Sequence, residues 1–233
     1  MTDTNFANTN GVKELFDTIP DAVEAFKAGE LIVVLDSMDR ENEGDLIMAA
    51  EHLTPAKCAF MVRHSSGYLC APITSSLAAK LELPQMVQNN TDPNRTAYTI
   101  TIDAAEGVTT GISATDRSLT CRKLADPTST IETFRRPGHV VPLQARKGGV
   151  RVRPGHTEAA VDFCSLAGLE QVGVIAELVD ATSGEETIAD METAVGMMRR
   201  DGCLAFAFKH GLKAVTIEDL VKHMEKVEGQ AKG

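Results

Sequence analysis

A loop between two apolar runs holds five carboxylates within ten residues. The runs, Leu31–Leu35 and Leu46–Ala50, are short and rich in Val, Ile and Leu, which predicts buried strands. Like charges this close raise each other's pKa values unless a cation lies among them, and carboxylate oxygens bind hard divalent metals. The loop is therefore a candidate metal site, the alternative being an acidic turn exposed to solvent. Its charged residues are Asp36, Asp39, Arg40, Glu41, Glu43 and Asp45.

Positive charge is concentrated in residues 133–157, which include six basic residues and no acidic one. The tetrapeptide RPGH occurs there twice, at Arg136–His139 and Arg153–His156. The second copy leads into a helix predicted over Thr157–Gly168, with Thr157 as its N-cap. Backbone N–H groups at a helix N-terminus favour anions, so this copy is a candidate phosphate site. An ordinary capped helix with a surface arginine is the alternative.

Together the two charged segments predict a small phosphorylated substrate bridged to a divalent cation. Either His139 or His156 could add an imidazole to the carboxylates, and such a mixed ligand set with several waters suits Mg²⁺ or Mn²⁺ better than Zn²⁺. Glu177 lies in the apolar run Val172–Val179, where an unpaired acid is costly, so Glu177 and the remaining histidine are candidates for proton transfer. The residues thus predict a metal-dependent enzyme that acts on a sugar phosphate.

Composition narrows the class of protein. The net charge of −10 argues against a general nucleic-acid or anionic-membrane partner, and the absence of Trp argues against a base-stacking platform. Five widely spaced cysteines indicate reduced thiols in a cytoplasmic protein. We expect no signal peptide and no membrane-spanning segment.

Strands and helices are predicted to alternate, which favours an α+β fold with three α/β/α layers: a mixed β-sheet with helices on both faces. A single domain is expected over residues 13–228, between a mobile tail at 1–12 and a frayed tail at 229–233. A turn is expected at Thr182–Glu186. Helices are predicted at Ala22–Gly29, Thr54–His64, Ser75–Leu81, Ala114–Leu124, Thr157–Gly168, Met191–Arg200 and from Thr216 onward. Strands are predicted at Leu31–Leu35, Leu46–Ala50, Tyr68–Ile73, Tyr98–Asp103, Val172–Val179 and Leu204–Phe208.

Four motifs closely resemble the 3,4-dihydroxy-2-butanone 4-phosphate synthases of riboflavin biosynthesis: DRENEGD at 39–45, AAEGVTTGIS at 104–113, RPGH at 136–139 and GHTEA at 155–159. The resemblance spans about residues 20–222, in family order. It implies a lyase that converts D-ribulose 5-phosphate to L-3,4-dihydroxybutan-2-one 4-phosphate and formate, through a metal-stabilised enediolate and skeletal rearrangement. It also implies Mg²⁺ (or Mn²⁺), two ions per site, and a homodimer with sites near the interface. Some relatives carry a fused GTP cyclohydrolase II domain, for which this chain is too short, so a monofunctional form is expected.

The same resemblance implies roles for individual residues. Glu41 and His156 match the family's metal ligands, and His139 and Glu177 resemble its proton-transfer residues. Glu43 and Asp36 are expected to support the ligands or handle protons. The expected substrate contacts are Arg40, Glu41, Asp45, Cys70, Thr110, Arg153, Pro154, Gly155, His156, Thr157 and Glu177. Arg153 and Thr157 are the main phosphate contacts among them.

The residue type limits or broadens the expected role at two of these positions. Pro154 removes a backbone donor where a phosphate could use one. Cys70 fits a small buried apolar residue as well as a pocket residue.

Two other functions fit the same residues. A metal-dependent pentose-phosphate isomerase or epimerase would share the site but release no formate. A non-catalytic module that binds metal and phosphate would show no turnover. All three functions require Glu41 and His156 to lie close enough to bind one metal ion together.

Overall fold

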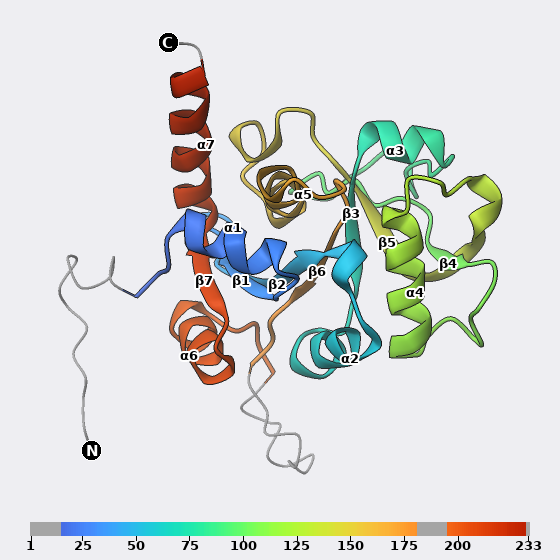
Figure 1. Ribbon diagram of the computed structural model, residues 1–233, viewed down its shortest axis with the longest axis horizontal. Coiled ribbons are helices and arrows are strands. Elements are labelled where there is room, and N and C mark those ends of the chain that lie inside the picture. The colour runs from blue at the N-terminus through green and yellow to red at the C-terminus, as the bar shows by residue number, and fades with distance from the viewer. Residues whose placement is uncertain (1–14, 181–194, 232–233) are drawn as a thin grey trace.

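The computed structural model describes residues 15–180 and 195–231. The mobile tail expected at 1–12 and the turn expected at 182–186 lie outside the described residues. In the described part, the strands form one mixed seven-stranded sheet in the order β4-β5-β3-β6-β2-β1-β7 (Figure 1). The strands are β1 Ile32–Leu35, β2 Gly44–Ala49, β3 Cys70–Thr74, β4 Ile102–Ala104, β5 Phe134–Ala145, β6 Gly173–Glu177 and β7 Lys213–Thr216. Strand β1 runs antiparallel to β2 and parallel to β7, whereas β3 runs parallel to β5 and antiparallel to β6.

Helices cover both faces of this sheet, which confirms the predicted three layers (Figure 1). On one face, α1, α5 and α7 bury side chains such as Phe26, Phe163 and Leu220 against the sheet. On the other face, α2, α4 and α6 bury Met61, Cys121 and others. The helices are α1 Ile19–Lys27, α2 Pro55–His64, α3 Ser75–Lys80, α4 Ala114–Ala125, α5 His156–Ala167, α6 Arg200–His210 and α7 Ile217–Ala231. Short 3₁₀ turns lie at Ala50–His52, Ile131–Thr133 and Gly149–Arg151.

Local capping signals located several helix ends correctly. The Thr54 hydroxyl accepts the N–H of Lys57 at 3.2 Å at the start of α2, and Thr216 accepts the N–H of Asp219 at 3.0 Å at the start of α7. Gly168 ends α5 in the left-handed conformation with φ of 69°. Helix α7 continues to Ala231, into the segment 229–233 that was predicted to be a frayed tail.

Two predictions near the C-terminus were wrong. The segment Leu204–Phe208 is not a strand but the middle of α6, because Cys203, Phe206 and Ala207 are buried at helical spacing while Phe208 is 91% exposed. Of the helix predicted over Met191–Arg200, residues 191–194 lie outside the described residues, residues 195–199 are not helical, and α6 begins at Arg200.

Two strands were not predicted at all. Strand β5 contains prolines and several basic residues, which argue against a strand inside a sheet, yet it lies between β4 and β3. The short strand β7 completes the sheet beside β1. Among the described residues, no helix combines the length and hydropathy needed to cross a bilayer.

Candidate active site

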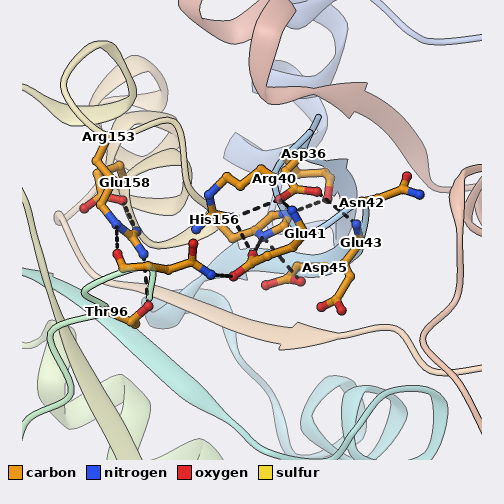
Figure 2. A network of polar contacts seen from close by, with 12 residues as sticks. Asp36, Arg40, Glu41, Asn42, Glu43, Asp45, Thr96, Arg153, His156 and Glu158 are labelled. Atoms are coloured by element: carbon orange, nitrogen blue, oxygen red, sulfur yellow. Dashed lines mark hydrogen bonds and ion pairs between the residues drawn. The ribbon is translucent and has the colours of Figure 1, made fainter. Parts of the chain in front are cut away.

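The acidic loop between β1 and β2 folds around the carboxylate of Asp36 (Figure 2). Its Oδ1 accepts the backbone N–H of Glu43 at 2.9 Å, and its Oδ2 accepts the N–H of Glu41 at 3.0 Å. The guanidinium of Arg40 donates to the same Oδ2 at 2.9 Å. The Asp36 side chain is fully buried, so its charge is used to order the loop.

The loop brings Glu41 to the first turn of α5, where His156 is the first helical residue. The Nδ1 atom of His156 lies 3.9 Å from Oε2 of Glu41, and ligand atoms of Asp36, Glu41 and His156 all lie within 4.8 Å of one another. The predicted N-cap was wrong by two residues, because Gly155 holds that position and Thr157 lies inside the helix. This shift places the imidazole, rather than a hydroxyl, at the helix entrance.

The tautomer of His156 follows from its backbone contact. Its Nε2 lies 3.1 Å from the carbonyl oxygen of Val34, so Nε2 carries the proton and donates to that oxygen. The lone pair of Nδ1 is then directed at the carboxylates. Burial is the main cause that lowers the pKa of His156 to about 4, so the ring is neutral at physiological pH and can act as a metal ligand.

Asp45 supplies a second sign of a cation site. Its side chain is buried, and its Oδ1 has no hydrogen-bond partner although it lies 3.6 Å from Nδ1 of His156. The sheet register pairs Asp45 with Glu177, which brings another carboxylate beside it. Burial, and then the charges of Glu177 and Glu41, raise the pKa of Asp45 well above its usual value. A divalent cation would give the orphaned oxygen a partner and offset this repulsion, so the residues present fit a metal.

Two arginines meet next to this acidic group. A Cβ atom on Gly155 would lie 2.5 Å from Nη1 of Arg153 and 3.0 Å from Nη2 of Arg40, so a larger residue there would displace guanidinium groups from this position. Arg153 donates to Oε2 of Glu158 at 2.6 Å and to the hydroxyl of Thr96 at 3.0 Å. This convergence of positive charge at a helix N-terminus is suited to an anion.

Most of the predicted site residues line one pocket together. From the predicted set, the lining residues are Arg40, Glu41, Glu43, Asp45, Cys70, Arg153, His156, Thr157 and Glu177. Residues that were not predicted, Thr96, Tyr98, Leu143 and Ile175, complete the lining. The predicted residues Asp36, Pro154 and Gly155 do not line the pocket: Asp36 is hydrogen-bonded to Arg40 and Glu41, and Pro154, which is exposed, and Gly155 lie between Arg153 and His156 in the chain.

His139 and Thr110 are not among the lining residues of that pocket. Asp103 of β4 binds His139 twice: Oδ2 lies 2.7 Å from Nδ1 of the ring, and Oδ1 accepts the backbone N–H at 2.9 Å. Gly111 packs on this pair, where a Cβ atom would lie 2.7 Å from Nδ1 of His139. Thr110 is therefore next to the His139–Asp103 pair, and its own side chain is exposed.

Three further polar residues around the site were missed by sequence reasoning. Asn94 donates to Oε1 of Glu41 at 2.6 Å, and Arg199 donates to the carbonyl oxygens of Glu41 and Asn42, each at 2.8 Å. Asp103 was treated only as the end of a strand. No local signal distinguished these residues, because Asn94 resembles a turn former and Arg199 belonged to a predicted helix.

Comparisons with known proteins identify the family. The family model described as 3,4-dihydroxy-2-butanone 4-phosphate synthase matches residues 20–223. The chain is 56% identical over 219 residues to the 3,4-dihydroxy-2-butanone 4-phosphate synthase of Pyricularia oryzae, covering 94% of each chain. It is 51% identical over 212 residues to the Candida albicans protein of the same name, covering 91% of this chain and 98% of that protein.

A solved structure gives the same result. It is described as 3,4-dihydroxy-2-butanone 4-phosphate synthase in complex with two magnesium ions, and it matches with a TM-score of 0.87 and 56% identity over 92% of this chain and 99% of that chain. The chain therefore belongs to the 3,4-dihydroxy-2-butanone 4-phosphate synthase family, whose members are enzymes of riboflavin biosynthesis.

Proposed function

We propose that this enzyme converts D-ribulose 5-phosphate into L-3,4-dihydroxybutan-2-one 4-phosphate and formate, with Mg²⁺ as its cofactor. The observation that carries the proposal is that acidic side chains and arginine side chains line the same pocket. A carboxylate–imidazole pair, Glu41 and His156, lies 3.9 Å apart beside the guanidinium groups of Arg40 and Arg153. A phosphorylated hydroxyketone that chelates a divalent cation has the matching chemistry.

Glu41 and His156 are the proposed metal ligands, with Asp36 holding the loop in place. A relative was solved in complex with two magnesium ions, which supports Mg²⁺ as the cation, and we propose two ions per site. When bound, the cation polarises a carbonyl oxygen and stabilises negative charge on neighbouring oxygens. The unpaired Oδ1 of Asp45 is the additional oxygen available to an ion or to a substrate hydroxyl.

The phosphate is assigned to Arg153, Thr157 and Arg40. Pro154 has no N–H, and the N–H of Gly155 already donates to the carbonyl oxygen of Arg153 at 2.8 Å. The backbone donors for an anion are therefore those of the first turn of α5, which have no acceptor within the helix.

His139 and Glu177 are the proposed proton-transfer residues. Asp103 holds Nδ1 of His139, which leaves Nε2 to give or take a proton. Glu177 accepts a hydrogen bond from the Ser66 hydroxyl at 2.7 Å and faces the pocket beside Asp45. Burial, and then the charge of Glu41, raise the pKa of Glu43, which suits a carboxyl group that exchanges protons.

We also propose a homodimer with its active sites near the interface. Large apolar side chains of Tyr68, Met86 and Val87 are 47%, 49% and 54% exposed around a hollow that shares Thr96 and Tyr98 with the active-site pocket. Exposed apolar patches of this kind mark interaction surfaces. Light scattering after size-exclusion chromatography should give twice the chain mass of 25.0 kDa.

One assay tests the proposed reaction. Purified protein is incubated with ribulose 5-phosphate and Mg²⁺, and formate is measured with formate dehydrogenase. Stoichiometric formate that disappears with EDTA and returns with Mg²⁺ is the expected result. Other pentose phosphates without formate would indicate an isomerase or epimerase, and binding without any turnover would indicate a non-catalytic module. Ribulose without the phosphate is the control for the anion site.

A further inference from the structure

Glu158, in the first turn of α5, has a buried carboxylate that contacts the proposed phosphate site without lining it. Only 1% of its surface is exposed. Its Oε2 accepts from Nη1 of Arg153 at 2.6 Å, and its Oε1 accepts the backbone N–H of Arg146 at 2.9 Å. Both oxygens are therefore used to hold other parts of the protein, and Figure 2 shows the contact with Arg153.

The hydrogen bond from Arg153 to Glu158 is one of three that fix the Arg153 guanidinium group. Its Nε donates to the carbonyl oxygen of Asn94 at 3.2 Å, and its Nη2 donates to the hydroxyl of Thr96 at 3.0 Å. A guanidinium group has five N–H donors in a rigid plane. After these three bonds, one N–H on each terminal nitrogen remains, and the direction of both is set by the anchors.

We propose that Glu158 is a positioning residue that aims the two remaining N–H groups of Arg153 at the substrate phosphate. This inference rests on the proposed function, since it takes the anion near Arg153 to be that phosphate. Two effects of Glu158 have opposite signs. Its negative charge repels a phosphate, whereas its hydrogen bond orders the guanidinium group. The proposal is that ordering outweighs repulsion, because Arg153 neutralises the carboxylate that it contacts.

The test compares Glu158→Gln with a matched control, Asp162→Asn. Asp162 lies one turn further along the same helix face, is 8% exposed, and accepts the N–H of Val150 at 2.8 Å in the loop that also contains Arg146. Both substitutions keep the side-chain size and remove one buried negative charge. Only Glu158 contacts Arg153 in this pair, so a general effect on the loop would appear in both variants.

Glu158→Gln is expected to raise KM for ribulose 5-phosphate about tenfold with kcat changed less than about threefold, and to weaken inorganic phosphate binding measured by calorimetry about tenfold. Asp162→Asn should leave both quantities near their wild-type values. Glu158→Asp keeps the charge on a shorter side chain and should give an intermediate KM, which provides a second measurement if the glutamine variant folds poorly. Phosphate binding that is unchanged or tighter in Glu158→Gln would overturn the proposal.

A double variant separates this inference from the proposed function. In an Arg153→Met background, Glu158→Gln should cause no further loss of phosphate affinity, because no guanidinium group remains to be ordered and only the repulsion by the carboxylate is removed. Additive losses would mean that Glu158 does not act through Arg153. Wild-type protein that binds phosphate but releases no formate would refute the proposed reaction alone, and the calorimetric comparison would still decide the role of Glu158.

Discussion

Replacing Asp36 by asparagine separates the two roles that a carboxylate in the metal loop could have. The structure assigns it to ordering the loop, through bonds from the N–H groups of Glu41 and Glu43 and from Arg40. An amide keeps the shape of the side chain but has one acceptor oxygen instead of two. When the amide oxygen takes the place of Oδ2, the amide NH₂ group faces the N–H of Glu43. When the amide oxygen takes the place of Oδ1, the NH₂ group faces the N–H of Glu41 and the guanidinium group of Arg40.

At least one buried donor therefore loses its acceptor in either orientation. Such a donor costs about 1–3 kcal/mol, and the remaining bonds lose the assistance of the charge, so the free energy of unfolding should fall by about 2–4 kcal/mol. For a chain of this size, that lowers Tm by about 5–15 °C. Loss of a group that orients a metal ligand should also weaken Mg²⁺ binding about 10- to 100-fold.

Both quantities can be measured on one preparation. Thermal unfolding with EDTA gives the stability of the metal-free protein, and a titration of formate release against Mg²⁺ gives the apparent metal affinity. Asp39→Asn is the matched control, because it removes a carboxylate with an exposed side chain from the same loop and should change neither quantity appreciably. The reasoning is refuted if Asp36→Asn lowers kcat while Tm and Mg²⁺ affinity stay at wild-type values, since that pattern describes a proton-transfer group.

Three further outcomes are expected. Glu41→Ala should abolish metal-dependent formate release and calorimetric Mg²⁺ binding, and near-normal release would disprove its assignment as a ligand. Asp103→Asn should lower kcat about 100-fold or more with a small change in KM, because the amide NH₂ faces Nδ1 of His139 and selects the wrong tautomer; an unchanged kcat would exclude His139 as the proton-transfer group. Cys70→Ala should change kcat less than about tenfold, because burial, and then the charge of Glu177, raise the pKa of the Cys70 thiol well above its usual value and keep it protonated at neutral pH; rapid labelling of Cys70 by iodoacetamide in the folded protein would contradict this.

Local patterns in the chain were enough to predict most of the framework. The apolar runs that became β1 and β2, the Thr54 cap of α2 and Gly168 at the end of α5 depend on neighbouring residues. The separation of charge into an acidic loop and a basic segment is also visible in the sequence alone. The failures arose where local preference and tertiary context disagree. The apolar run in α6 fits a strand or a helix equally well, and the prolines of β5 weaken its strand signal although the sheet accepts it.

The amino-acid sequence by itself determined which chemical groups are present, and its motifs determined the family. Tertiary structure alone decided how those groups meet. The register of β2 on β6 sets Asp45 opposite Glu177, and the packing of the loop after β1 against the start of α5 brings Arg40 and Arg153 together beside Gly155. The physical reason is that these contacts join residues far apart in the chain, so they are selected by the packing of the whole sheet and its helices rather than by the preferences of any one segment.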